Sequence, residues 1–262
     1  MRILSLAVWC LLLCASCQTD SGQIIKIVIE DATPEEQGTI GLELSRVLNA
    51  ELPVRPRPTE GSDPGYDYLG AVLRPLALNP ATDRRRLYDW RVWIIEDDTE
   101  TSAFTLPGGQ IYLYTGLLRS LRDESELAAV LAHEITYADT DFMLLALLGN
   151  NDIGGERLGD ILIGNPVEDA TQIAEAIPEL TMIASYVLTA DEQAVRRICP
   201  MNYRSEALRK VLARTPEEPL DWLSTRTTIL ETRLSHMDDL LETCPAGGVR
   251  NVEAYRSFLN RL

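Results

Sequence analysis

Residues 123–137 read DESELAAVLAHEITY, and this stretch decides the fold. Asp123 suits a helix N-cap, and Glu126 three residues later completes a capping-box pattern that favours the positive end of a helix. Apolar residues then recur at helical spacing, and residues 142–148 continue apolar on most sides. The stretch therefore predicts a helix that is buried nearly all round and runs on through 142–148.

Two segments before this helix have strand character. Residues 89–96 are rich in aromatic and β-branched side chains, and Gln110–Tyr114 has the same character. Pro107-Gly108-Gly109 precedes the second segment and can form only a turn or a sharp bend. We therefore expect a small sheet beside the buried helix.

Residues 102–134, SAFTLPGGQIYLYTGLLRSLRDESELAAVLAHE, closely resemble the HtpX, Oma and CaaX-prenyl-protease group of zinc endopeptidases, peptidase family M forty-eight. That group shows Asn-Ala-Phe-Ala-Leu-Pro-Gly-Gly, then an aromatic strand ending in Gly-Leu-Leu, then Asp-Glu-x-Glu-Leu-Ala before its zinc helix. The resemblance runs from about Glu36 to the C-terminus and is closest to soluble, lipid-anchored envelope members. It implies an α+β, mostly helical, gluzincin-like metallopeptidase domain with a small β-sheet beside the zinc helix.

The zinc motif itself is incomplete. In His-Glu-x-x-His, a helix places two imidazoles on one face where both bind zinc, and the Glu activates the metal-bound water. Here His133 and Glu134 are followed at the fifth position by Tyr137. The resemblance implies that His133 keeps a ligand position, that Glu134 is the general base of the family and that Tyr137 stands at a lost ligand position.

The third ligand position is also changed. The family takes it from a Glu four residues before an Asp, and the matching residues here are Val187 and Asp191. Val187 has no lone pair to donate, while Tyr137 binds a metal only as phenolate. The resemblance implies that Asp191 contacts the zinc-binding His rather than the metal. The family's Ser-x-His-Pro element matches 224–227, which lack the His, with Arg233 downstream, and Ser102 replaces the usual Asn.

We therefore expect no metal cofactor, and Glu134 without a polarised water is idle. His133 is expected as a neutral imidazole hydrogen-bonded to Asp191 or Glu134, with Tyr137 filling the metal space. In the alternative, zinc is held by substitute ligands, for which the sequence offers Asp139, Asp141, Asp191, Glu192 and His236. His236 more often fits a surface or cap position.

Two functions follow from these expectations. The first is a catalytically inactive relative that binds extended or unfolded peptide segments or other envelope proteins, using the retained cleft strand with Phe104, Leu106, Gly108 and Gly109. The alternative is an active zinc metalloendopeptidase with non-standard ligands in envelope protein quality control. A relic with only structural value is a third reading.

The N-terminus has the pattern of an export signal. Arg2 precedes an apolar run, 3–13, which is too short to span a bilayer permanently. Cys14-Ala15-Ser16-Cys17 resembles a bacterial lipobox, in which Cys17 carries the lipid; an ordinary signal peptide cut near Ser16 is the alternative. We expect a signal peptide at 1–16, a lipidated Cys and tether at 17–33 and the peptidase-like domain at 34–262. The mature chain is then lipid-anchored on the periplasmic face, and Gln18 after the Cys favours the outer membrane.

Composition and cysteines agree with an exported protein. The formal net charge of -16 over 262 residues argues against nucleic-acid binding. Cys199 and Cys244, each followed by proline, suit a disulfide in an oxidising compartment or two separate small core residues.

The remaining segments have simpler patterns. Residues 36–52 and 66–78 read as amphipathic helices, with an extended proline-rich stretch at 53–58 between them. A short strand fits 24–29, and a Gly- and Asn-rich loop or broken helix fits 149–166. From residue 168 on we expect helices separated at Pro178, Pro200, Pro216 to Pro219 and Pro245.

Overall fold

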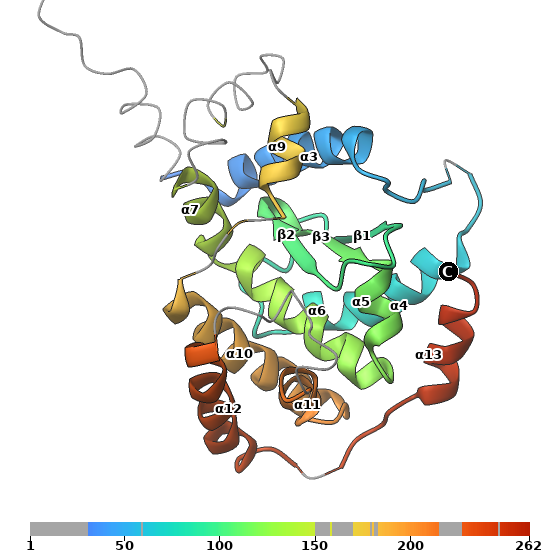
Figure 1. Ribbon diagram of the computed structural model, residues 1–262. Helices are drawn as coiled ribbons and strands as arrows, with labels where there is room; N and C mark the ends of the chain where they lie inside the picture. The colour runs from blue at the N-terminus through green and yellow to red at the C-terminus, as the bar shows by residue number, and fades with distance from the viewer. Residues whose placement is uncertain are drawn as a thin grey trace, which may run out of the picture.

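The computed structural model describes residues 31–58, 60–149, 158, 170–178, 180, 183–214, 227–245 and 247–262 (Figure 1). The expected signal peptide, Cys17, the strand at 24–29, most of 149–166 and the positions 216–219 and 224–226 lie outside the described residues. Within them, the prediction of a mostly helical α+β fold with one small sheet is confirmed.

The sheet has three strands in the order β1-β3-β2. β3 (Gln110–Tyr114) lies in the centre, parallel to β1 (Arg91–Ile95) and antiparallel to β2 (Ala103–Leu106). The predicted strand at 110–114 is confirmed. A turn of 3-10 helix, η2 (Pro107–Gly109), joins β2 to β3, and Gly108 and Gly109 have φ values of 76° and 83°, which favour glycine. The expected cleft strand from Phe104 to Tyr114 is therefore two strands, of which β2 lies at an edge of the sheet and β3 in its centre.

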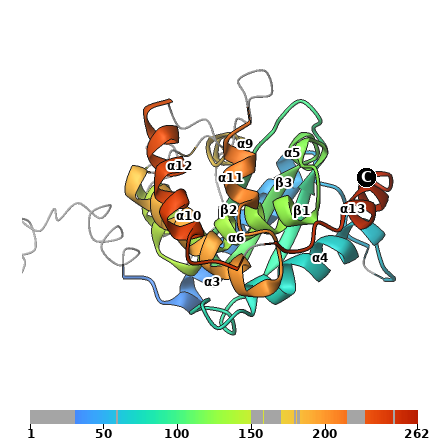
Figure 2. The ribbon, with the colours of Figure 1, turned by 90° about the horizontal axis from the view of Figure 1, so that it is seen from below.

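Helices cover both faces of the sheet (Figures 1 and 2). Strand alternation sends Ile111 and Leu113 into one core with α4 (Pro64–Ala77) and α6 (Glu124–Asp139). It sends Tyr112 and Tyr114 into a second core with α3 (Pro34–Glu51). The helices predicted at 36–52 and 66–78 are thus confirmed, and the sheet lies between two apolar layers.

The other helices surround these layers. α5 (Thr115–Ser120) follows β3, and α7 (Phe142–Gly149) and α9 (Ala170–Ala176) follow α6 in the chain. Then come α10 (Ala184–Ile198), η3 (Cys199–Met201), α11 (Ala207–Leu212), α12 (Thr227–Leu241) and α13 (Val252–Leu259). None of the helices in the described part of the chain combines the length and apolar content needed to cross a membrane.

α6 begins after the predicted N-cap but ends earlier than the sequence predicted. Asp123 is the N-cap, as predicted, and its carboxylate accepts from the Glu126 N–H at 3.1 Å. Glu126, however, accepts from the N–H of Arg122 at 2.7 Å, so the capping box is not closed on Asp123 itself. The helix stops at a C-cap, Thr140, whose hydroxyl bonds the carbonyl of residue 136 at 2.7 Å. The apolar run at 142–148 is a separate helix, α7, and the expected continuation was wrong.

The proline-rich stretch protects one edge of the sheet. Val54 forms an antiparallel bridge with Ile95, and the Arg55 N–H donates to the Ile94 carbonyl at 2.8 Å. The stretch is extended, as predicted, and prolines suit an edge because they lack an N–H. On the other edge β2 has no strand beside it among the described residues.

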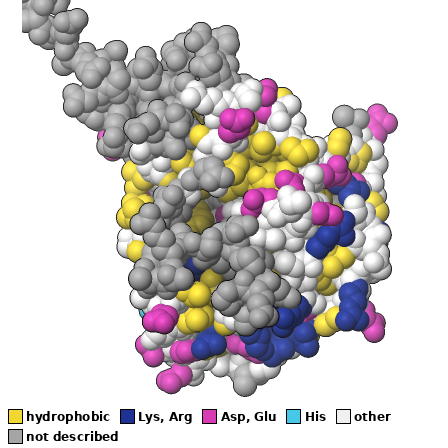
Figure 3. Space-filling model, viewed as in Figure 1, with side chains coloured by type: hydrophobic (Ala, Val, Ile, Leu, Met, Phe, Trp, Pro, Cys, Tyr) yellow, Lys and Arg dark blue, Asp and Glu magenta, His cyan; other side chains and the backbone are white. Residues whose placement is uncertain are grey.

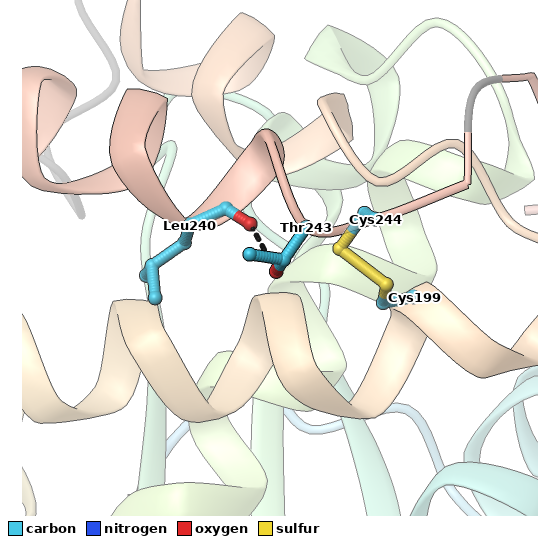
Figure 4. Close-up of a disulfide and its surroundings, with 4 residues drawn as sticks. All are labelled: Cys199, Leu240, Thr243 and Cys244. Carbon is cyan, nitrogen blue, oxygen red and sulfur yellow. Dashed lines mark hydrogen bonds between the residues drawn. A yellow bond between two sulfur atoms is a disulfide. The ribbon is translucent and has the colours of Figure 1, made fainter.

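Two distant helix ends are joined covalently. Cys199, at the end of α10, forms a disulfide with Cys244, just after α12, and their Cα atoms are 5.6 Å apart (Figure 4). Of the two arrangements left open by the sequence, the structure has the disulfide. In the same turn the Thr243 hydroxyl donates to the carbonyl of Leu240 at 2.7 Å. The bond fixes the end of α12 to α10, the helix that carries Val187 and Asp191.

Candidate functional site

The site expected from the sequence lies where α6 packs against α10 and α12. His133, Glu134 and Tyr137 come from α6, Val187 and Asp191 from α10, and Arg233 from α12. All six side chains are buried. The structure therefore brings together the residues that the sequence placed in one site, together with Arg233.

His133 lies between two carboxylates. Its Nε2 is 3.2 Å from Asp191 Oδ1, and its Nδ1 is 3.7 Å from Glu134 Oε1. Burial alone would lower the pKa of the imidazole, yet hydrogen bonding to Asp191 and Glu134 raises the pKa above its ordinary value. Asp191 and Glu134, the two partners expected from the sequence, thus flank the ring, and their charges favour its protonated form over the neutral one.

Asp191 is held mainly by Arg233. Arg233 Nε lies 2.7 Å from Oδ2 and Arg233 Nη2 lies 2.8 Å from Oδ1, a two-point contact between buried groups. Burial opposes ionisation, but the hydrogen bonds from Arg233 and His133 hold the pKa of Asp191 below its ordinary value. Asp191 thus links α6 to α12 as a carboxylate.

Tyr137 stands on the same face of α6 as His133, four residues on. The two rings meet edge to face, with centroids 5.0 Å apart and planes at 87°. Burial, and next to it the charge of Glu134, raises the pKa of Tyr137 well above its ordinary value. The phenol of Tyr137 is therefore neutral at pH 7.

The residues present do not fit zinc. Structural and catalytic zinc sites take at least three nitrogen, sulfur or carboxylate donors from the protein. Here Val187 has an aliphatic side chain, 3% exposed, and Tyr137 is a neutral phenol. Among the described residues no group of three or more His, Cys, Asp or Glu side chains could hold a metal ion.

The substitute ligands named from the sequence are engaged elsewhere. Four acidic side chains each bind an arginine: Asp139 with Arg197 at 2.9 Å, Asp141 with Arg84 at 2.5 Å, Asp191 with Arg233, and Glu192 with Arg196 at 2.8 Å. His236 has a side chain 38% exposed and lies 3.7 Å from Glu192. Of the five, only Asp191 lies beside His133, where Arg233 already binds it.

A buried arginine that the sequence analysis did not single out fixes the end of α6. Arg197, 1% exposed, donates to the Thr136 hydroxyl at 2.5 Å, to the Thr82 hydroxyl at 3.1 Å and to Asp139 at 2.9 Å. The signal was present, because Arg197 lies on the apolar face of an amphipathic helix, where a charged side chain needs a buried partner. Its partners lie far away in the chain and could not be named.

The side chains proposed to contact a substrate are buried. Phe104 and Leu106 on β2 are 6% and 0% exposed, and Gly108 and Gly109 are buried as well. Phe104 and Leu106 therefore present no exposed side chain to a substrate.

Apolar side chains reach the surface close to the site. Phe142 on α7 stacks on Tyr186 of α10, with ring centroids 3.9 Å apart, and both pack against the core cluster that contains Tyr137. Leu145, one turn along α7 from Phe142, and Ile183, the N-cap residue that precedes α10, are 37% and 56% exposed. These two residues with the stacked Phe142 and Tyr186 are called the apolar rim below.

The comparisons with known proteins agree with the motif. Residues 67–151 match the model of Peptidase family M48. The mitochondrial metalloendopeptidase OMA1 of Schizosaccharomyces pombe is 38% identical over 71 residues, which are 27% of this chain and 20% of that protein. The Bos taurus metalloendopeptidase OMA1 is 46% identical over 48 residues, which are 18% of this chain and 9% of that protein. The Danio rerio metalloendopeptidase OMA1 is 32% identical over 78 residues, which are 29% of this chain and 16% of that protein.

The resemblance to the M48 zinc metallopeptidases is confirmed, and the family match covers β1 to α7 with the His133-Glu134 pair. The matched part spans a fifth or less of the length of these curated relatives.

Proposed function

We propose that this relative of the M48 metallopeptidases is catalytically inactive and binds protein segments in the cell envelope. The observation that carries the loss of catalysis is the donor set. The two positions that should complete the zinc site hold Tyr137 and Val187, and Asp191, one of the two carboxylates beside His133, is bound by Arg233. A full zinc site is worth on the order of 10–16 kcal/mol with all its ligands. One imidazole does not replace that set.

The proposed place of binding is the apolar rim of Phe142, Leu145, Ile183 and Tyr186. Exposed large apolar side chains that gather at one place mark interaction sites in soluble proteins. Phe142 and Tyr186 of the rim pack against the core cluster that contains Tyr137, so a client would bind close to the position of the lost zinc ligands. The proposed occupant is an unfolded or extended polypeptide with apolar side chains.

The proposed location is the periplasmic face of a bacterial envelope, reached through the N-terminal signal and a lipid on Cys17. The disulfide between Cys199 and Cys244 supports export, because disulfides persist in oxidising compartments. Labelling with a radioactive fatty acid tests the anchor: wild type should incorporate the label and Cys17→Ser should not. Label in both chains would contradict lipidation at Cys17.

Metal analysis of the purified protein tests the loss of catalysis. We expect no stoichiometric zinc and no casein cleavage that depends on Glu134, with Glu134→Gln as the matched control. About one zinc per chain, with cleavage lost in Glu134→Gln, would overturn the proposal in favour of an active zinc metalloendopeptidase.

Restoring the ligands tests whether the scaffold is intact. The double substitution Tyr137→His with Val187→Glu should create a zinc site, and each single substitution should bind at least tenfold more weakly. Zinc binding by the double variant and not by wild type would show that the two side chains, rather than a change of fold, abolish the site.

Binding of fluorescein-labelled, denatured casein tests the rim. Ile183→Asp and Leu145→Asp should each weaken binding at least fivefold. Leu87→Asp is the control, since Leu87 is 51% exposed and does not belong to the rim. Equal affinity in all four proteins, wild type included, would remove the rim as the binding surface and leave the conclusion about zinc unchanged.

A further inference from the structure

A cavity at the N-terminal end of α6 differs in charge from the rest of the chain. It has a volume of about 220 Å³ and is lined by Arg122, Asp123, Ser125, Glu126, Arg204, Ala207, Lys210 and Arg250. Four of these eight residues are cations, on a chain whose formal net charge is -16. In Figure 3 most of the Lys and Arg side chains on the face shown lie in its lower half. The cavity is thus a positively charged region of a negatively charged protein.

The two carboxylates in the lining are already used by the fold. Asp123 caps α6 and accepts from Arg250 Nε at 2.7 Å. Glu126 accepts from the N–H of Arg122 and forms a buried ion pair with Arg214. Both are 5% exposed or less, so they form the floor of the cavity and each has its own cation.

Two of the cations that line the cavity share a single acid. Glu206 binds Arg204 and also Lys210, the latter at 2.9 Å. Arg122 is exposed, and its side chain has no ion-pair partner among the described residues. The lining thus holds four cations, Arg122, Arg204, Lys210 and Arg250, against the two acids Asp123 and Glu126, a surplus of two positive charges.

The kind of hydrogen-bond donor in the lining limits the class of ligand that the cavity can bind. Guanidinium groups offer paired N–H donors that match the oxygen atoms of a phosphate, and three of the four lining cations are arginines. The N-terminal end of a 16-residue helix borders the same space, where Asp123 caps it and the Ser125 hydroxyl donates to the Val249 carbonyl and accepts from the Arg204 N–H. Because the chain as a whole repels anions, any binding must come from this local arrangement rather than from net charge.

We propose that this cavity binds a phosphate group, either as free phosphate or in the headgroup of an anionic lipid. The proposal does not depend on the former zinc position, since none of that site's residues lines the cavity. Two cations of the cavity lining are exposed enough to reach a ligand: the side chains of Lys210 and Arg250 are 48% and 49% exposed.

Calorimetric titration of the full chain tests the proposal with two ligands. Inorganic phosphate is the first, and dihexanoyl phosphatidylglycerol below its micelle concentration is the second. Arg122→Gln combined with Lys210→Gln should weaken binding at least tenfold, and each single variant about threefold. Arg46→Gln is the control, because Arg46 is 72% exposed on α3 and lines no part of the cavity.

The outcomes separate the two sources. Tighter binding of inorganic phosphate indicates a free phosphate, and tighter binding of the lipid indicates a headgroup; either must fall in the double variant. Absence of binding, binding that the double variant leaves unchanged, or acetate bound as tightly as phosphate would overturn the proposal. Circular dichroism and unfolding temperature of each variant must match wild type, and the single variants keep the test valid if the double variant does not fold.

Discussion

Arg233 on α12 binds Asp191 on α10 through two hydrogen bonds, at 2.7 and 2.8 Å, and both side chains are 2% exposed or less. The same carboxylate lies 3.2 Å from His133 on α6. Three helices, α6, α10 and α12, are thus joined through one carboxylate. Asp191 is therefore a point of attachment between helices.

Removing Arg233 from its pair with Asp191 should lower the free energy of unfolding. Arg233→Leu leaves Asp191 buried without its cation, and we expect a loss of about 3–5 kcal/mol in the free energy of unfolding. Arg196→Ala, which removes an exposed pair with Glu192, should cost at most about 1 kcal/mol. Urea denaturation checks both. A loss in Arg233→Leu as small as in the control would show that the buried pair does not hold α12 in place.

Tyr137 should act by filling space. Tyr137→Ala removes a buried ring beside His133, and we expect a cost of about 3–5 kcal/mol from lost contacts and the cavity left behind. Tyr137→Phe keeps the ring and should cost no more than about 1.5 kcal/mol, the contribution of one hydrogen bond. Chemical denaturation measures the difference between the variants. A cost for Phe as large as for Ala would assign the importance to the hydroxyl rather than to the ring.

Much of the fold was predictable from local pattern. β3, the turn at Pro107–Gly109 and the start of α6 after Asp123 were all predicted, because strand composition, glycine and an N-cap act over a few residues. The end of α6 was missed. Residues 142–148 continue the apolar pattern, and the pattern does not show that Thr140 leaves the helical conformation. The residue types at the zinc position were also readable, since Tyr and Val at ligand positions need no structure to interpret.

Long-range partners were not predictable in the same way. The pairing of Arg233 with Asp191 spans 42 residues and that of Arg197 with Thr82 spans 115. Sequence pattern shows that a charged residue lies on an apolar helix face, but not which distant group meets it. The direction of the pKa shift of His133 was not predictable for this reason, because it depends on how the carboxylates of Asp191 and Glu134 are placed around the ring.

The disulfide should stabilise the α10 and α12 pair. Cys199 and Cys244 are 45 residues apart in the sequence, and a crosslink of that span restricts the unfolded chain. We expect Cys199→Ala with Cys244→Ala to lower the free energy of unfolding by about 2–4 kcal/mol. Urea unfolding of wild type with and without a reductant should show a similar loss. The double variant should not respond to the reductant, and a response there would place the effect elsewhere.

Acid should weaken the contact between α3 and the segment after α6. Partial burial opposes ionisation of Asp141, yet hydrogen bonds from Arg84 and Gln37 hold its pKa below the ordinary value. A depressed folded-state pKa contributes stability that is present above the unfolded pKa, near ~4, and is lost as the pH falls through the folded pKa. Wild type should therefore lose more stability than Asp141→Asn between roughly pH 5 and pH 2. Parallel slopes in denaturation series at these pH values would contradict this.

Gly41 should tolerate no side chain, because α3 lies directly on the turn between β2 and β3. A Cβ at Gly41 would lie 1.7 Å from the carbonyl oxygen of Pro107, which is backbone and cannot rotate away. We expect Gly41→Ala to cost about 3 kcal/mol or more, since α3 must move off the turn. Gly38→Ala on the same helix meets nothing within 4 Å and should stabilise by about 0.5–1 kcal/mol. Thermal and urea unfolding of the two variants compare them directly, and equal effects would show that α3 is not seated on Pro107.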